Sequence, residues 1–407
     1  MIKNYLRKLI NYFDNLELGY QSALVGCLCS LISISLAGPD LYTYLLMMTH
    51  DSSGYSRYYD TFVPQVSDVF FRPADNNWHG GFLGYRILIP LLAKSFGLGP
   101  VGALGLIWLA GWASLSLVYR YLAQITNART AFLFTLGLSL TSMGWGSHSY
   151  LGYPDAVSWL LIMIMLVYPS WSSWLICPLL AMFNDERMIV SIPFVLAILL
   201  YKDRDDLLLI LKKSIFYLSS TALAIAIGYL GREAIRVGLI GNHPIMDPIY
   251  PTSGIGAYQL RFYIEGLLIS FGALWILPLA AVFTQPRDAK KSRAYWLGLV
   301  IYSISAIIFC AFPFDFCRSL ACIFPLFILC IIQIYQSNPK LANQLLLWIC
   351  LFMLLIPKLD QVGSTILWVR PLPVGIFEYK TKQSLFSRFK AFYHDRRFTG
   401  SISLFRD

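Results

Sequence analysis

The stretch AMFNDERMIVSIP, residues 181–193, places three charged residues in a row between two apolar segments. Apolar residues dominate from Ser172 to Phe183 and again from Met188 to Tyr201. As a helix rising about 1.5 Å per residue, each segment covers only about 20 Å, whereas the hydrocarbon core of a bilayer is about 30 Å thick. The sequence therefore predicts a short helical hairpin whose polar turn lies in a wet cavity below the membrane surface. A plain polar turn with an internal ion pair is the alternative.

The whole chain has the composition of a polytopic membrane protein. Of its 407 residues, 57% are hydrophobic and only 13% are charged, whereas a soluble domain carries about 25% charged residues. Apolar runs predict an all-α protein with about 11 membrane-spanning helices (about 10 to 12). The predicted spans are 20–37, 100–121, 130–146, 154–169, 171–183, 188–201, 214–231, 262–283, 294–312, 318–335 and 342–357. We expect a single transmembrane domain over 1–357, followed by a basic tail over 358–407.

The net charge of +10 comes from clusters of Lys and Arg at the N-terminus, in short loops and in the tail. Such clusters are typical of cytoplasmic loops and of contact with anionic lipid, so no nucleic-acid partner is expected. With a cytoplasmic N-terminus, the basic loops 202–213 and 286–293 are cytoplasmic, and we expect an uncleaved first span in a bacterial inner (plasma) membrane. The odd number of spans puts the tail outside, unless 362–378 crosses once more. The loops expected outside are 38–99, 147–153, 184–187, 232–261 and 313–317.

The first outer loop, 38–99, is long and contains five isolated aspartates. Its apolar end, 86–96, is too short to cross a bilayer and predicts an interfacial or re-entrant helix. The eight cysteines mostly fall in apolar runs and lack the spacing of a zinc site, so we expect small buried side chains. A Cys310–Cys317 bridge is the alternative. The sequence shows no clear metal motif, which leaves the cofactor unknown and a divalent cation open.

The outer loops hold nearly all the distinctive polar residues, and the predicted topology brings them to one face. The acids considered for catalysis are Asp60, Asp75, Asp155, Asp185 and Glu186. The residues considered for binding a lipid-linked phosphate or substrate are Arg86, Arg187, Arg318, His148, His79 and Asp315.

Each of these candidates also has a purely structural interpretation. Asp155 follows Pro154 at a helix start, where an acidic residue is favoured locally. Asp315 and Arg318 are spaced i, i+3 and can form an ion pair on one helical turn. His148 can carry protons or bind a metal, but it can also simply make a loop hydrogen bond.

The acidic first loop followed by YRILIPLLA (85–93), in a polytopic chain with its polar loops outside, resembles the GT-C superfamily of membrane glycosyltransferases. The resemblance covers most of 1–357 and is one of architecture more than of motif. It implies inverting transfer of a sugar from a polyprenyl-phosphate donor to a saccharide or protein acceptor at the outer face. Asp60 matches the position of the family's loop-one acid, which acts as the base, and basic residues hold the lipid phosphate. Two departures are the isolated aspartates, where the family often has an adjacent acidic pair, and the lack of a large C-terminal soluble domain.

Two other functions fit the same composition. A transporter or flippase of a lipid-linked saccharide should have broken helices and essential charges near the membrane midplane. A non-catalytic subunit of a larger membrane assembly should tolerate loss of the outer acids but not of its lateral apolar surface.

Overall fold

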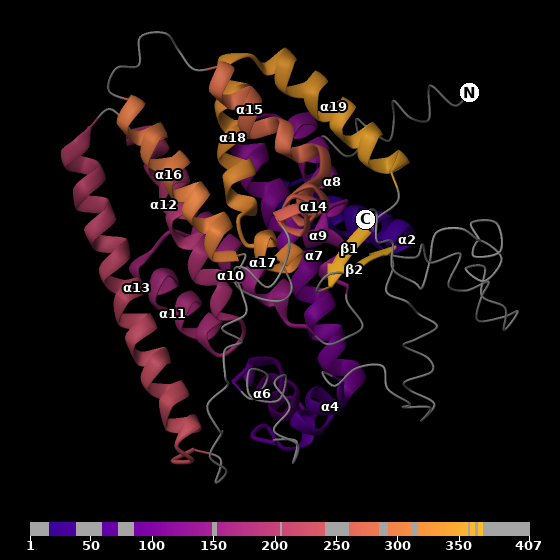
Figure 1. Cartoon of the computed structure of the whole chain (residues 1–407), viewed down its shortest axis with the longest axis vertical. Helices are drawn as coiled ribbons and strands as arrows, with labels where there is room; N and C mark the ends of the chain where they lie inside the picture. Colours follow the sequence, from indigo (N-terminus) through magenta and orange to yellow (C-terminus); the bar gives the residue numbers. More distant parts are fainter. Residues whose placement is uncertain are drawn as a thin grey trace, which may run out of the picture.

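The computed structural model describes residues 16–37, 59–71, 85–148, 153–203, 206–240, 260–284, 292–310, 316–356, 359–362 and 365–368. These ranges are helical apart from one short β-hairpin (Figure 1). The first half of the chain forms α2 (Leu18–Ala37), α4 (Tyr59–Ser67), α6 (Leu88–Ser95), α7 (Pro100–Ile125), α8 (Ala128–Ser139), α9 (Ser142–Gly146), α10 (Asp155–Val167), α11 (Trp171–Met182), η1 (Glu186–Ser191), α12 (Ile192–Leu200) and η2 (Tyr201–Asp203). The second half forms α13 (Leu207–Arg236), α14 (Leu260–Phe271), η3 (Gly272–Trp275), α15 (Ile276–Phe283), α16 (Ser292–Cys310), α17 (Phe316–Ala321), α18 (Phe324–Ser337), α19 (Pro339–Leu355), β1 (Leu359–Val362) and β2 (Thr365–Trp368).

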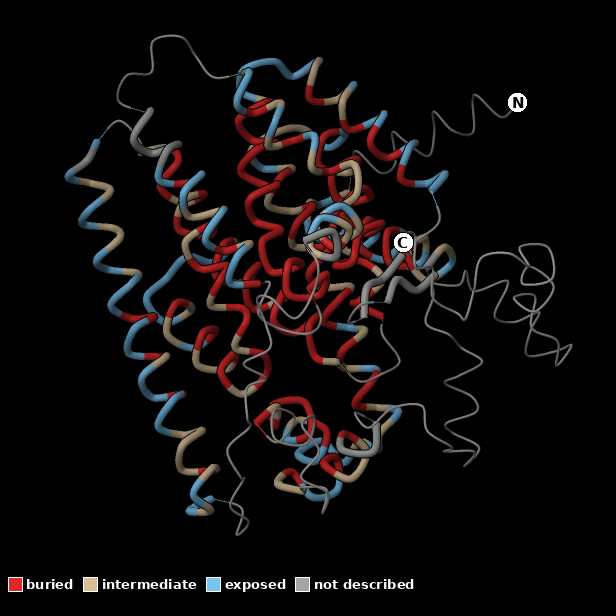
Figure 2. Tube along the Cα trace, viewed as in Figure 1, coloured by how far each residue is buried: buried red, intermediate tan, exposed pale blue. Residues whose placement is uncertain are grey.

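Four helical segments in the described ranges are long and apolar enough to cross a membrane, which indicates a membrane protein. They are Leu18–Leu36, Pro100–Ile125, Leu208–Arg236 and Tyr263–Phe283. Several shorter apolar helices pack among them. Large apolar side chains of α13 are exposed along its length, and Figure 2 colours many residues of this long helix, at its left edge, as exposed. An apolar exterior of this kind is what contact with lipid requires.

The interior of the bundle is formed around α7 and α18. α18 is buried from Phe324 to Ile334 and is apolar over this stretch except at Gln333, the pattern of a helix enclosed by other helices. α2 lies along α7, where the Trp112 indole Nε1 donates a hydrogen bond to the Ala23 carbonyl at 3.0 Å. The two backbones approach so closely that a Cβ on Gly26 would lie 2.0 Å from the Ser116 hydroxyl oxygen. Small residues at this contact allow the close packing that membrane helices use in place of the hydrophobic effect.

Hydrogen bonds between turns define two ends of the bundle. At one end, which we call the Asn127 end, Asn127 Nδ2 donates to the Tyr335 hydroxyl at 3.2 Å and the Ser337 hydroxyl donates to the Thr284 carbonyl at 2.8 Å. The opposite end, which we call the Asp185 end, contains the turn between α11 and η1. This arrangement agrees with the predicted alternation of the turns, while the side of the membrane that each end faces stays a prediction.

Several predicted spans are interrupted. The predicted helix 130–146 breaks between α8 and α9, and 318–335 breaks between α17 and α18. The predicted span 262–283 changes direction at Gly272, whose φ of +52° suits glycine rather than residues with a side chain. Hydrophobicity is continuous across the breaks at 271–276 and 321–324, so apolar periodicity alone did not reveal them, whereas the break between α8 and α9 falls in the run Ser-Leu-Thr-Ser at 139–142.

Two minor alternatives can be compared with the structure. The described part of the supposed extra crossing 362–378 belongs to a β-hairpin in which Leu359 pairs with Trp368. The run of Thr, Ile, Leu and Trp in β2 has high strand propensity. Residues 369–378 lie outside the described ranges, so whether this stretch crosses the membrane stays a prediction. None of the eight cysteines is in a disulfide, so the alternative of a bridge between Cys310 and Cys317 is wrong. Their thiols instead donate to the Ser319 and Gly266 carbonyls, each at 3.3 Å.

Candidate functional site

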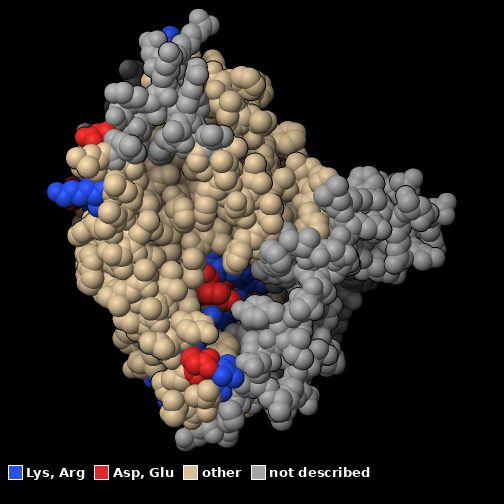
Figure 3. Space-filling model, turned by 60° about the vertical axis from the view of Figure 1, so that its left-hand side comes forward, with Lys and Arg blue, Asp and Glu red and all other residues tan. Residues whose placement is uncertain are grey.

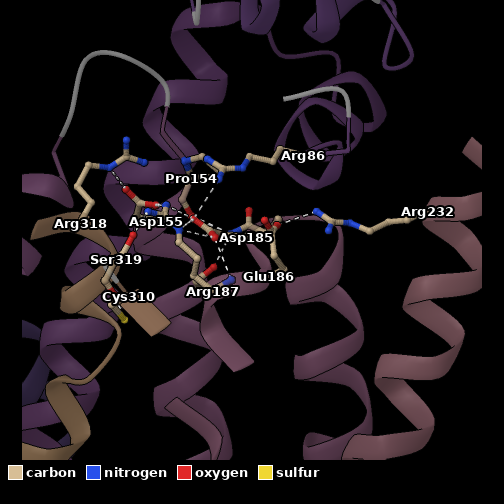
Figure 4. Close-up of polar contacts among 12 residues, drawn as sticks. Arg86, Pro154, Asp155, Asp185, Glu186, Arg187, Arg232, Cys310, Arg318 and Ser319 are labelled. Atoms are coloured by element: carbon tan, nitrogen blue, oxygen red, sulfur yellow. Dashed lines mark hydrogen bonds and ion pairs between the residues drawn. The ribbon is translucent and has the colours of Figure 1, made fainter. Parts of the chain in front are cut away.

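The polar turn at 184–187 is packed against the start of α10. Asn184 Nδ2 donates hydrogen bonds to the Pro154 carbonyl and to the Ser158 hydroxyl, both at 2.8 Å. The Asp185 carboxylate accepts a hydrogen bond from the Arg187 backbone N–H at 3.1 Å and so caps η1. The turn is therefore fixed in one conformation against α10, with its charged side chains facing the bundle interior (Figure 4).

Arg187 is the centre of the charged network. Its Nε donates to the two Asp185 oxygens at 2.8 and 3.0 Å, and its Nη2 donates to Asp155 Oδ1 at 2.8 Å and also to Asp185. Its Nη1 donates to the Ser319 hydroxyl at 3.0 Å. One guanidinium therefore joins three segments of the chain: the start of α10, the polar turn and α17.

Arg318 binds the other side of the same Asp155 carboxylate. Its Nε donates to Asp155 Oδ2 at 2.7 Å, so each Asp155 oxygen accepts from a different arginine. The Arg318 guanidinium carbon also lies 3.4 Å from the centre of the Tyr153 ring, a cation–π contact that orients the guanidinium plane. Asp155 and Tyr153 thus hold Arg318 in place from two directions.

Two further arginines border this centre. Arg86, just before α6, approaches Asp185 with an N–O distance of 3.6 Å. Arg232, near the end of α13, pairs with Glu186 at 2.7 Å and lies 5.0 Å from the centre of the Tyr85 ring. We call these residues together the arginine cluster: Arg86, Arg187, Arg232 and Arg318 with Asp155, Asp185 and Glu186. Among the described residues the cluster has four cations against three anions.

The cluster is buried at its centre and accessible at its edge. Asp155, Asp185, Arg187 and Arg318 expose at most 9% of their surface, whereas the Glu186 side chain exposes 27%. Figure 3 shows acidic and basic side chains in a hollow of a face that is otherwise mostly uncharged. The geometry is therefore that of a charged recess with a buried floor and a partly exposed rim.

The charged state of the turn follows from its arginines. Burial by itself raises the pKa of the Asp185 carboxyl, but Arg187 and Arg86 outweigh burial and hold that pKa well below its usual range. Burial by itself also raises the pKa of the Glu186 carboxyl, but Arg232 outweighs burial, and the pKa of Glu186 stays below its usual value. Carboxylates held ionised in this way are poor proton acceptors. In the described structure both carboxylates orient arginines, and their catalytic role stays a prediction.

The depth of the cluster can be read from α13. Residues 214–231 of this helix contain no charged residue and cover about 27 Å, close to the thickness of a hydrocarbon core. Lys212 and Lys213 lie before this apolar stretch, and Arg232 follows it directly. The Arg232–Glu186 pair therefore lies where the uncharged stretch of α13 ends, at the Asp185 end of the bundle.

The structure brings together six of the eleven predicted site residues. These are Arg86, Asp155, Asp185, Glu186, Arg187 and Arg318. Arg318 pairs with Asp155, a partner 163 positions away that sequence spacing did not suggest. The internal Asp185–Arg187 pair of the polar-turn interpretation is also present, so that turn combines a local pair with long-range contacts.

His148 lies apart from these ion pairs. It is buried, its Nδ1 is 3.1 Å from the Gly144 carbonyl, and its ring meets Trp108 edge to face. Burial lowers the pKa of His148 to about 4, so this side chain is neutral near pH 7. The contacts agree with the loop hydrogen bond considered from the sequence rather than with a cationic phosphate ligand.

Four predicted residues depend on segments outside the described structure. Asp60 lies in the first turn of α4, but its side chain is not among those described. Asp75, His79 and Asp315 lie outside the described residues. Among the residues that the structure does describe, no group of three His, Cys, Asp or Glu side chains could hold a metal ion.

Sequence reasoning missed Tyr85, Tyr153, Ser319 and Arg232 as parts of this site. Arg232 had a usable signal, because it is the first charge after a long apolar stretch. The contacts of Tyr153 and Ser319 depend on how α10 packs against α17, and no local sequence pattern predicts that packing. Comparison with family models, with curated proteins and with solved structures finds no match, so the function has to be inferred from the geometry of the site itself.

Proposed function

We propose that the chain is a membrane glycosyltransferase that moves a sugar from a polyprenyl-phosphate donor to an acceptor at the outer face of the membrane. In this proposal the fold is GT-C-like with about 11 spans. The N-terminus is cytoplasmic and the Asp185 end faces outward. The acceptor is a saccharide or protein of the cell envelope, and the membrane is a bacterial inner membrane.

The observation that supports this proposal is the arginine cluster at the Asp185 end of the bundle. Arg86, Arg187, Arg232 and Arg318 converge from four separate segments. Arginine presents a planar fork of donors that matches phosphate oxygens. A cationic recess in an apolar bundle suits an anionic group carried on a lipid.

The described residues would act on the donor's phosphate. Arg318 and Arg86 are the phosphate ligands in this proposal: Arg318 binds Asp155 from the side opposite Arg187, and Arg86 approaches Asp185 with an N–O distance of 3.6 Å. Asp155 and Asp185 are positioning residues that hold these arginines. As the sugar leaves, negative charge grows on the phosphate oxygens, and fixed guanidinium groups stabilise that charge.

The base in this proposal is Asp60, with Asp75 as the next candidate. The carboxylate takes the proton of an acceptor hydroxyl while the hydroxyl oxygen attacks the anomeric carbon of the sugar. The bond from that carbon to the phosphate oxygen breaks, and the polyprenyl phosphate leaves with the electron pair. Attack opposite the leaving group inverts the anomeric configuration. Loss of such a base typically slows a reaction about 10²–10⁴-fold.

The test is a transfer assay with purified protein, a set of radiolabelled polyprenyl-phosphate hexoses and extracted envelope acceptor. We expect Asp60→Asn to abolish transfer without weakening donor binding, and Arg318→Gln to weaken both. Arg120→Gln is the matched control, because Arg120 contacts Tyr168 away from the cluster. Equal transfer by Arg318→Gln and the unmutated protein would reject the phosphate-binding role, and absence of transfer with every donor would reject the transferase.

One observation favours a second function, transport of a lipid-linked saccharide. α14 and α15 are separated by the short 3₁₀ segment η3 at Gly272, and interrupted helices are common in transporters. The charges of the described cluster, however, gather at one end of the bundle rather than near its middle. Movement of a fluorescent polyprenyl-phosphate sugar across liposomes, without transfer, would favour the transporter.

A further inference from the structure

An apolar cavity of about 590 Å³ opens between α9, α14 and α19. It is lined by Trp145 of α9, Leu268 of α14, Ala273 of η3, and Trp348 and Phe352 of α19. The volume falls within the range of about 300–1,000 Å³ that is typical of ligand sites. None of the side chains just named carries a charge, so the lining suits a hydrocarbon ligand.

The cavity has a buried floor and an exposed rim. Ile349 and Met353 of the floor are almost fully buried, whereas Leu268, Trp348 and Phe352 of the rim expose 57%, 69% and 55% of their surface. Large apolar side chains with such exposure face lipid in a membrane bundle. The cavity is therefore open to the side, towards the bilayer interior, and a lipid chain can enter it without crossing water.

α14 connects the cavity to the arginine cluster. Its Gly266 carbonyl accepts a hydrogen bond from the Cys317 thiol at 3.3 Å, and the next residue of α17 is Arg318. Leu268, two residues after Gly266, lines the cavity. Helix geometry and Cα spacing then place Leu268 on the order of 10–15 Å from Arg318. Tyr263 of α14 packs against Phe316 of α17 with ring centres 5.5 Å apart, which fixes the two helices together.

We propose that this cavity holds the hydrocarbon chain of a single-chain lipid phosphate whose phosphate group is bound at Arg318. The proposal rests on the proposed function for the phosphate end and adds a separate site for the chain. Charge complementarity assigns the phosphate to the arginine cluster, and the uncharged lining assigns the chain to the cavity. Affinity should then increase with chain length up to the length that fills the cavity.

The test compares geranyl phosphate, a short-chain probe, with a long-chain polyprenyl phosphate on the full chain in lipid nanodiscs. Ala273→Phe places a bulky ring inside the cavity, while Leu279→Phe adds the same ring at an exposed position of α15 and serves as the control. We expect Ala273→Phe to weaken binding of the long-chain probe at least tenfold and to leave geranyl phosphate within about twofold. Leu279→Phe should change neither affinity.

A crosslinking measurement on the unmutated protein keeps the test valid if Ala273→Phe does not fold. A long-chain polyprenyl phosphate with a benzophenone at mid-chain should label peptides containing 268–276 or 345–356, and labelling confined to α13 would overturn the cavity assignment. Unchanged long-chain affinity in folded Ala273→Phe would overturn it as well, while loss of geranyl phosphate binding in Arg318→Gln would still support the proposed function. Failure of both probes to bind the unmutated protein would instead overturn the phosphate site and the cavity together.

Discussion

Replacing Arg187 with methionine should strongly destabilise the protein, because it leaves two buried carboxylates facing each other. Met keeps an unbranched apolar stem but ends where Nε of Arg would lie, so the variant loses the positive charge and every hydrogen bond of the guanidinium. Asp155 keeps Arg318 at 2.7 Å, and Asp185 keeps Arg86 only at 3.6 Å. The variant therefore keeps one partner for each carboxylate, but a weaker one for Asp185.

The size of the effect follows from the geometry. One oxygen of Asp155 and one of Asp185 both accept from Arg187 Nη2, so these oxygens lie within about 6 Å of each other. Two unit charges at that distance repel by about 3 kcal/mol at an effective dielectric constant of about 20. Removal of one member of a buried ion pair typically costs about 3–5 kcal/mol. We therefore expect Arg187→Met to lower the free energy of unfolding by about 3–5 kcal/mol.

Unfolding can be followed with a thiol-reactive dye, since seven of the eight cysteines are buried and only Cys27 is exposed. Measurements in a Cys27→Ser background remove its signal. The control Arg120→Met should cost no more than about 1 kcal/mol, because this half-buried arginine has its hydroxyl partner in an exposed setting. Adding Asp185→Asn to Arg187→Met should restore part of the stability by removing one of the repelling charges. A loss below 1 kcal/mol in Arg187→Met, or no rescue by the second change, would refute the network.

Three further outcomes are expected. The pKa of Asp185 is lower in the folded than in the unfolded protein, so its contribution to stability is present above the unfolded pKa of about 4 and is lost as pH falls through the folded pKa. When the free energy of unfolding is measured against pH, this loss of stability at acid pH should be absent in Asp185→Asn. Asn184→Ala removes two buried hydrogen bonds to α10 and should cost about 1–3 kcal/mol in chemical unfolding. Gly26→Ala should cost about 1–3 kcal/mol by clashing with Ser116, whereas Gly105→Ala, with open space around it, should be neutral in the same measurement.

Much of the helical architecture could be predicted from the sequence, because long apolar runs indicate segments that are buried in lipid or in protein. The predicted spans 100–121 and 214–231 lie within α7 and α13. The breaks inside other spans could not be predicted. They depend on single backbone conformations, such as the positive φ of Gly272, that leave hydrophobicity unchanged.

The candidate site was partly predictable for a different reason. Charges in an apolar chain are costly unless paired, so Asp155, Asp185, Arg187 and Arg318 could each be selected from the sequence alone. Which charge pairs with which depends on tertiary packing. Local spacing offered Asp315, which lies outside the described residues, as a partner of Arg318, and that pairing stays a prediction; folding brings α17 against α10 and supplies Asp155 as a partner. The base proposed at Asp60 stays a prediction, because its side chain is not among those described.

The most direct test of the arginine cluster as a lipid-phosphate site is the affinity of geranyl phosphate for three proteins in nanodiscs. These are the unmutated chain, Arg318→Gln and the control Arg120→Gln. Charge-assisted hydrogen bonds contribute about 1.5–3 kcal/mol, so Arg318→Gln should weaken binding at least tenfold while Arg120→Gln binds normally. Geraniol, which has the same chain without the phosphate, should not compete. Equal affinity of Arg318→Gln and the unmutated chain, or effective competition by geraniol, would contradict the phosphate site.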